Sequence, residues 1–314
     1  MSITLSTGRR VAAGLLGSAL ALLAAGAPAA AAPAEATGTF SITAPQLVLD
    51  PTDQGYVGTF TVTVTNNGTV ADYPTLALTE PAGGSHTTID PGFGCTIQGL
   101  TQNRMRSQCT GEEIAAGASK AYTLGFHVWT TPQKYAMIAT GGEIGVLEVG
   151  SGELSDNVAF TTLFRSTNGS LKKPKPYVQA TQSDIRASTT PGTVALSRLA
   201  DGSLQGRMPL TVRYGNDAPS YDLGVEATLP EGVVVDHIEP QDAPSWNLGF
   251  SVPGGRFMPG EERTFDVILR APAETPAGEL GAGSYTVTSS YCYCEPVQDV
   301  DPTDNTTSFT VTAS

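Results

Sequence analysis

Two cysteines and a run of carboxylates stand together near the C-terminus, in the stretch "CYCEPVQDVDPTDN". Cys292 and Cys294 are separated by one residue, and Asp299, Asp301 and Asp304 follow them. Thiolates bind soft metals such as Zn²⁺ or Cu⁺, whereas carboxylates suit Ca²⁺. Residues i and i+2 of a strand lie about 6.6 Å apart, so a disulfide between these cysteines requires a bulge or strain. The stretch is therefore a candidate metal, redox or structural site.

The acids of this stretch fit a turn better than a metal loop. No glycine-containing loop of the EF-hand type surrounds them, and a zinc site would need further nitrogen or sulfur ligands. The pair Asp304-Asn305 has a counterpart, Asp156-Asn157, 148 positions earlier in the chain. Asp and Asn in turns accept hydrogen bonds from their own backbone. We expect a structural turn and no cofactor, and we keep Asp299, Asp301 and Asp304 as alternative Ca²⁺ ligands.

The N-terminal segment predicts export. Arg9-Arg10 precede the apolar run "VAAGLLGSALALLAAGA", and small residues follow it. This order is typical of a secretory signal peptide, and the run is shorter than the roughly 20 apolar residues that a membrane span needs. We predict a signal peptide over residues 1–31, a short tail over 32–37, and no membrane insertion after cleavage.

Composition narrows the class of protein. The 314 residues carry a net charge of −13, which becomes −15 once Arg9 and Arg10 are removed (−13 − 2). Such acidity argues against nucleic acid as a partner, because nucleic-acid binding requires clustered Lys and Arg. Only 15% of residues are charged and 40% are hydrophobic, so the chain can bury a core. We expect a monomer outside the cell, secreted or associated with the cell wall.

The chain contains an internal repeat. "GTFTVTVTNNGTVADYPTLALTEPAG" begins at Gly58, and "GRMPLTVRYGNDAPSYDLGVEATLPEG" begins at Gly206. Further landmarks pair in the same order: Tyr73 with Tyr221, Pro81 with Pro230, Gly117 with Gly260, and Tyr122 with Phe265. Several matches in one order indicate two related domains.

Each copy alternates apolar and polar residues with the period of a strand. Phe60, Val62 and Val64 alternate with threonines, which predicts a half-buried strand. Short strands separated by turn residues favour a sandwich. We therefore predict an all-β chain of two tandem antiparallel β-sandwiches, over residues 38–165 and 179–314, joined by a Lys/Pro linker over 166–178. Prolines make this linker an extended spacer; its lysines alternatively form a contact for an acidic wall polymer.

The frame "TVTVTNNGT…LALTEPAGG…CTIQG…CTGEEIAAGASKAYTLGF" resembles the conserved-repeat Ig-like domains of bacterial surface and secreted proteins. The second copy, closing on "DPTDNTTSFTV", is similar to the related bacterial cell-adhesion domain type. The resemblance implies two seven-stranded Ig-like sandwiches that act as a stalk, spacer or adhesive module, and it brings no catalytic residues. The Cys292-x-Cys294 pair departs from that pattern.

The remaining cysteines predict a disulfide. Cysteines of exported proteins are usually oxidised, and Cys95 and Cys109 lie in the same predicted domain. Their bond would close a 15-residue loop, a constraint of roughly 3 kcal/mol in the chain-entropy model. Cys292 and Cys294 form a possible strained pair, which would be easier to reduce.

No catalytic site is predicted. The three histidines, His86, His127 and His237, belong to no nucleophile–base motif. The acidic pairs Glu112-Glu113 and Glu261-Glu262 precede predicted strands at turns, where solvated charge is expected. We predict a non-catalytic structural, spacer or adhesive module whose partner is an unknown protein or cell-wall polymer. The alternative is a soluble extracellular binding module for a carbohydrate, a peptide or Ca²⁺.

Overall fold

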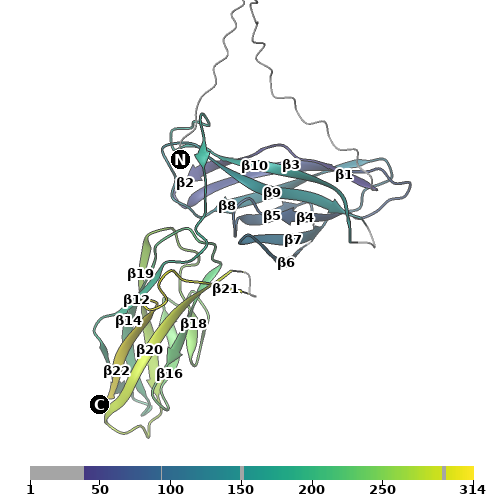
Figure 1. The fold of residues 1–314 in the computed structure, drawn as a ribbon. Coiled ribbons are helices and arrows are strands. Elements are labelled where there is room, and N and C mark those ends of the chain that lie inside the picture. The colour runs from purple at the N-terminus through teal and green to yellow at the C-terminus, as the bar shows by residue number, and fades with distance from the viewer. Residues whose placement is uncertain (1–38, 93, 149–151, 292–294) are drawn as a thin grey trace, which may run out of the picture. The chain divides into compact units, whose positions relative to one another are not determined.

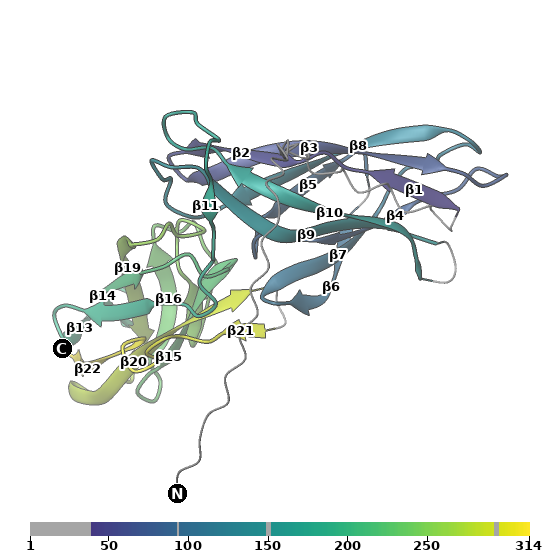
Figure 2. The same cartoon turned by 45° about the horizontal axis from the view of Figure 1, so that its top comes forward.

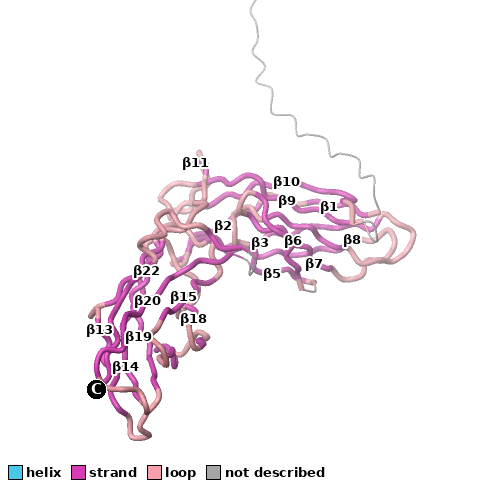
Figure 3. The backbone as a smooth tube through the Cα atoms, turned by 60° about the horizontal axis from the view of Figure 1, so that its bottom comes forward, coloured by secondary structure: helices cyan, strands magenta, loops and turns pink. Residues whose placement is uncertain are grey.

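The computed structural model describes residues 39–92, 94–148, 152–291 and 295–314. These residues form strands, turns and loops and contain no helix (Figure 3). Within this part of the chain, no helix has the length and apolar character that crossing a membrane requires. The described residues belong to one compact unit. The all-β prediction is confirmed. The predicted signal peptide and tail lie outside the described residues.

The first sheet occupies the N-terminal half of the described chain (Figure 1). Its strands are β1 (Phe40–Thr43), β2 (Leu47–Thr52), β3 (Gly55–Asn66), β4 (Thr75–Thr79), β5 (His86–Asp90), β6 (Cys95–Thr101), β7 (Arg104–Thr110), β8 (Ser119–Val128), β9 (Met137–Leu147), β10 (Leu154–Phe164) and β11 (Lys175–Pro176). The order of pairing is β5-β8-β3-β2-β10-β9-β4-β7-β6, while β1 pairs with β3 and β11 with β9.

The second sheet follows with the C-terminal strands. They are β12 (Ile185–Thr189), β13 (Thr193–Arg198), β14 (Leu204–Tyr214), β15 (Asp222–Thr228), β16 (Val234–Glu239), β17 (Ser245–Trp246), β18 (Gly249–Ser251), β19 (Glu261–Ala271), β20 (Gly278–Tyr291), β21 (Glu295–Val297) and β22 (Thr306–Ala313). Their order is β16-β19-β14-β13-β22-β20-β15-β18-β17, while β12 pairs with β14 and β21 with β20.

The alternation seen in the sequence places one face of each long strand in a core. In β3, Phe60, Val62 and Val64 are buried, while the intervening threonines face outward. The outward threonines hydrogen-bond across the sheet, as between Thr61 and Thr123, whose hydroxyl oxygens lie 3.1 Å apart. Cross-strand pairs of this kind stabilise a sheet. Two separate apolar cores result, one for each sheet.

The two sheets follow the same strand order when β2, β3, β4, β8, β9 and β10 are matched with β13, β14, β15, β19, β20 and β22. Gly58 and Gly206 occupy matching places, because a Cβ added to either would lie within 3 Å of a leucine side chain, Leu49 or Leu196. Both glycines therefore allow a neighbouring strand to cross closely. Gly58 and Gly206 thus occupy similar positions in the two sheets.

The C-terminal part of the predicted linker pairs with the first sheet, where β11 lies beside β9 (Figure 2). The N–H of Lys175 donates to the Ala136 carbonyl oxygen at 2.9 Å, and the N–H of Tyr177 donates to that of Ile138 at 2.8 Å. The Tyr177 ring lies 4.8 Å from the Phe164 ring, centroid to centroid. The end of the segment, residues 175–177, is therefore held against the first sheet by its backbone hydrogen bonds.

Candidate functional site: a buried polar junction

The most unusual buried group is the carboxylate of Glu80, which directly follows β4 and is 0% exposed. Its oxygens accept the backbone N–H groups of Gly84 and His86, each at 2.8 Å, and of Met105 at 3.1 Å. The hydroxyl of Tyr291, at the end of β20, donates a short hydrogen bond to the same carboxylate. A buried carboxyl is tolerated only when it is hydrogen-bonded in this manner.

Burial raises the pKa of Glu80 above its ordinary value of 4.5, although the hydrogen bonds from Tyr291 and from three backbone N–H groups act in the opposite sense. Desolvation disfavours the charged form, while donors favour it. The pKa of Tyr291 is raised as well, first by burial and then by the Glu80 charge. The tyrosine therefore keeps its proton and remains the donor.

Aromatic and basic side chains surround this acid. Tyr291 is 1% exposed and packs in a small cluster with Met105. Its ring stacks on that of Tyr221, with centroids 5.7 Å apart. The Arg256 guanidinium lies over the Tyr221 ring, 4.2 Å from its centroid, and donates to the Gly84 carbonyl oxygen at 2.7 Å. Cation–π contacts of this kind add to the stability of partly buried clusters.

A second carboxylate, Asp217, stands in the loop between β14 and β15 and gathers donors from the first sheet and the linker. Its Oδ2 accepts the Thr130 hydroxyl at 2.8 Å and the Tyr177 hydroxyl at 2.9 Å. Its Oδ1 accepts the N–H of Ala180 at 3.0 Å. Burial, followed by the charge of Asp217, raises the pKa of Tyr177, so this hydroxyl also stays protonated and donates.

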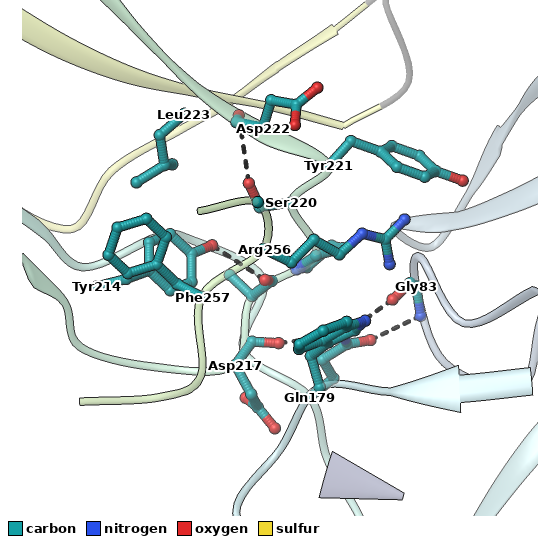
Figure 4. A pocket seen from close by; sticks show the side chains of 14 residues that line it. Gly83, Gln179, Tyr214, Asp217, Ser220, Tyr221, Asp222, Leu223, Arg256 and Phe257 are labelled. Atoms are coloured by element: carbon teal, nitrogen blue, oxygen red, sulfur yellow. Dashed lines mark hydrogen bonds between the residues drawn. The ribbon is translucent and has the colours of Figure 1, made fainter. Parts of the chain in front are cut away.

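Gln179 connects the two carboxylate clusters. Its Oε1 accepts the N–H of Gly83 at 2.7 Å, while its Nε2 donates to the carbonyl oxygens of Gly83 and Asp217, at 3.1 and 3.0 Å. Figure 4 shows this side chain between Gly83 and Asp217. Together with Glu80, Tyr291 and Asp217, it forms what we call the polar junction.

A pocket adjoins the polar junction (Figure 4). Tyr214 and Phe257 form its apolar side, while Ser220, Tyr221 and Arg256 form the polar side. The Tyr214 hydroxyl donates to the Ala218 carbonyl oxygen at 2.9 Å, and burial raises its pKa above the ordinary value. Tyr214 is thus held as a neutral donor inside the protein. Its hydrogen bond to Ala218 holds the loop between β14 and β15 in place.

The imidazole rings of the three histidines contact backbone or acidic groups, and the backbone N–H of His86 donates to Glu80. A ring nitrogen of His86 lies 3.1 Å from the Thr88 carbonyl oxygen, and one of His127 lies 2.6 Å from that of Gln54. His237 contacts Asp236 at 2.9 Å. Burial lowers the pKa of His86. In the described part of the chain, no hydrogen bond joins a histidine ring to the side chain of a serine, threonine or cysteine.

One member of each acidic pair, Glu112 or Glu261, forms local contacts. Glu112 forms an ion pair with Lys120, and its carbonyl oxygen accepts the Tyr122 hydroxyl. Glu261 forms an ion pair with Arg263 at 2.6 Å, and its pKa is lowered by that partner together with the Met258 N–H, against the effect of burial. Both side chains remain partly exposed, at 45% and 33%, and solvated charge stays the prediction for the two acidic pairs.

The structure places the three candidate Ca²⁺ ligands in a turn region where each has a structural contact. Asp299 accepts the Ser183 hydroxyl at 2.8 Å and the N–H of Ile185 at 2.9 Å, while Asp301 accepts the N–H and hydroxyl of Thr303. Asp304 lies 3.3 Å from Arg186. The Ca²⁺ interpretation stays a prediction.

In the first sheet, the side chains with contacts most like those of Asp299 are Ser155 and Asp156. They accept N–H groups from β1. The Ser155 hydroxyl oxygen accepts the N–H of Phe40, and Asp156 accepts that of Ile42, both at 2.9 Å. In the second sheet, the side chain of Asp299, and not that of Asp304, accepts the N–H of Ile185, the first residue of β12. Asp156 and Asp304, which the sequence pairs, therefore make different contacts: Asp156 accepts a backbone N–H through its side chain, whereas Asp304 lies beside Arg186.

The disulfide prediction for Cys95 and Cys109 is confirmed. These residues face each other on β6 and β7. The loop predicted between them is a tight hairpin, in which Gln102 and Asn103 adopt positive φ values of 52° and 57°; such values are typical of a type I′ turn. Cys292 and Cys294 lie outside the described residues.

One cluster of potential metal ligands in the described residues includes the same two cysteines. The possible ligand atoms of His86, Cys95 and Cys109 lie within 4.8 Å of one another. Metals bind thiolates, and both sulfurs are committed to the disulfide. The oxidised protein therefore offers only the histidine as a ligand there.

The sequence interpretation missed the polar junction. "LTEPAG" contains Glu80 at the end of a strand, and "ATLPEG" contains Leu229 at the equivalent place before the proline. An acid at the place where the aligned segment has an apolar residue was the available signal. Tyr291 and Asp217 carried no comparable signal, because their partners are more than 35 residues away in the sequence.

No protein-family model and no curated protein matches the chain. Three solved structures are distantly similar over 88% of the chain. A protein of unknown function from Porphyromonas gingivalis W83 is 10% identical over 100% of its own chain, with a TM-score of 0.23. Red sea bream transglutaminase is 13% identical over 31% of its chain, at 0.20, and the E. coli chaperone DraB is 10% identical over 97%, at 0.24. Scores this low carry no argument about fold or function.

Proposed function

We propose that the chain is a non-catalytic exported spacer or adhesive protein built from two tandem Ig-like sandwiches. The polar junction is the observation that carries this proposal. Its carboxylates and tyrosines are consumed in hydrogen bonds that join the first sheet, the linker and the second sheet. Groups used in this way hold protein segments together, as a spacer requires.

The matching strand orders support the Ig-like, duplicated architecture within this proposal. Gly142 and Gly283 lie against the phenylalanine rings of Phe160 and Phe309 in the same manner. A duplicated unit would keep such close contacts, because a Cβ at either glycine would lie 2.6 Å from a ring carbon.

A distance measurement between the two sheets tests the spacer proposal. We would attach labels, by chemistry that does not use cysteine, at the exposed residues Val70 and Leu199 and measure the distribution of distances in solution. A polar junction that fixes the two sheets predicts a narrow distribution, which Tyr291→Phe should broaden. A broad distribution in the wild-type protein would contradict a spacer.

Fractionation of the producing culture tests export. The mature chain, beginning near residue 32, should appear in the medium or with wall fragments. Recovery of the uncleaved chain inside the cells alone would contradict this part of the proposal.

A further inference from the structure

Lysine is distributed unevenly in this protein. The chain contains five lysines, and four of them, Lys134, Lys172, Lys173 and Lys175, lie within 42 positions of one another (175 − 134 + 1). All four are exposed. A net charge of −13 makes such a concentration of positive charge unexpected for a simple solvated surface.

Backbone hydrogen bonds bring these lysines onto two adjacent loops of the first sheet. The N–H of Thr167 donates to the Gln133 carbonyl oxygen at 2.9 Å, and the N–H of Lys175 donates to that of Ala136 at 2.9 Å. The loop that carries Lys134 is therefore held beside the segment that carries the other three. We call these four side chains the lysine patch.

The lysine patch is not neutralised by neighbouring acids. Most other basic side chains of the described residues have a carboxylate within ion-pair distance: Lys120, Arg165, Arg186, Arg207, Arg263 and Arg270. No such partner occurs for the four patch lysines among the described residues. Their charge is available to a ligand.

An aromatic ring accompanies the charge. Tyr135 is 40% exposed, and the ammonium of Lys175 lies 4.0 Å from its ring centroid. Pairing of β11 with β9, together with Pro174 and Pro176, holds the backbone of the segment in place. A surface that is already ordered loses little conformational entropy on binding.

We propose that the lysine patch and Tyr135 bind an extended anionic polysaccharide, with its acidic groups on the ammonium groups and a sugar ring against the tyrosine. This inference rests on the proposed location outside the cell. A polysaccharide with one charge per sugar suits the patch better than nucleic acid, because the acidic remainder of the protein repels a more densely charged polymer.

Binding of the mature chain to polygalacturonate, which carries one carboxylate per sugar, tests this inference. The affinity should fall as salt is raised, with a log–log slope of about −3 for four contacts, taking roughly −0.7 per contact as for single-stranded polyanions. The neutral methyl ester of the same polymer should bind at least about tenfold more weakly, because it lacks the charge.

Two variants with the same change in net charge separate the patch from general electrostatics. K134Q/K172Q/K173Q/K175Q should weaken binding by about tenfold or more. R104Q/R106Q/R198Q/R213Q removes four positive charges that are distributed over β7, β13 and β14, and it should change the affinity by less than about twofold, because screening limits exposed charges at a distance. Tyr135→Ala should weaken binding without changing the salt slope.

Equal loss in both fourfold variants, no binding at low salt, or tighter binding to single-stranded DNA or to anionic vesicles than to polygalacturonate would overturn the inference. These results are independent of where the protein is found in the culture. An intracellular protein that still binds the polymer through the lysine patch would contradict the proposed function and leave the binding surface standing.

Discussion

The turn that follows β4 in the first sheet and the turn that follows β15 in the second occupy matching places in the strand order and differ in their chemistry. Thr79 and Thr228 end these strands, opposite Glu143 and Ser284 of β9 and β20. The next residue is Glu80 in one sheet and Leu229 in the other, and a proline follows both. Leu229 packs against its own core, whereas Glu80 binds Tyr291 at the end of β20. Two sheets with the same strand order thus differ at this place, and only the first places a carboxylate there.

The hairpins beyond these strands also differ. The β6–β7 hairpin carries the Cys95–Cys109 disulfide, while the shorter β17–β18 hairpin has no cysteine and leaves Trp246 and Leu248 about half exposed, at 50% and 54%. The first sheet therefore has two local constraints, a buried acid and a disulfide, that the second lacks at equivalent places.

Converting the first turn to the chemistry of the second gives the largest expected effect. Glu80→Leu removes the acceptor of three backbone N–H groups and the Tyr291 hydroxyl, so the free energy of unfolding should fall by about 3–5 kcal/mol. Urea denaturation measures this change. Glu226→Leu, at an exposed acid on β15, is the control; an equally small shift in both variants would contradict the role of Glu80.

Removing the disulfide should have the next largest effect. C95A/C109A should lower the free energy of unfolding by about 3 kcal/mol, because the 15-residue loop is no longer closed in the unfolded chain. Urea denaturation of the oxidised variant and wild type gives the difference. A loss below about 1 kcal/mol would show that the hairpin is held mainly by its strand pairing.

The matching glycines should respond alike in the two sheets. A Cβ at Gly58 would lie 2.4 Å from the Val48 carbonyl oxygen, and one at Gly206 would lie 2.7 Å from that of Ala195. Gly58→Ala and Gly206→Ala should each lower the free energy of unfolding by about 1–3 kcal/mol. Gly192→Ala, where no neighbouring atom lies within 4 Å, is the control. A large cost in only one sheet would break the equivalence.

The smallest expected effect is a pH dependence confined to the first turn. The folded pKa of Glu80 lies above its ordinary value of 4.5, so its protonated form favours folding. Its contribution is fully present below pH 4.5 and is lost as pH rises through the folded pKa. The stability of the wild-type protein relative to Glu80→Gln should therefore fall with rising pH above 4.5, by at most about 1.4 kcal/mol per pH unit.

Urea denaturation of both proteins at several pH values gives this difference. Parallel pH profiles for the wild type and Glu80→Gln would show that Glu80 does not titrate abnormally. The same profiles for Leu229→Gln should show no additional pH dependence, because no acid is removed there.

The local pattern of the sequence was sufficient for strands, turns and one disulfide. Alternation around Phe60, Val62 and Val64 has a period that only a strand can place on one face, and the structure buries all three. Cys95 and Cys109 are the two cysteines of the first predicted domain. They face each other on paired strands. These features depend on residues that are near one another in the chain or confined to one sheet.

The sequence by itself determined the all-β class and the order of strand-forming segments, because each strand records its buried face in its own residues. Only the tertiary structure decided the polar junction and the lysine patch. Glu80 and Tyr291 stand 211 positions apart, and no periodic pattern connects them. The loop of Lys134 reaches the linker lysines only because β11 pairs with β9. The energy of a buried charge depends on which groups surround it in space, and that information is absent from any single segment.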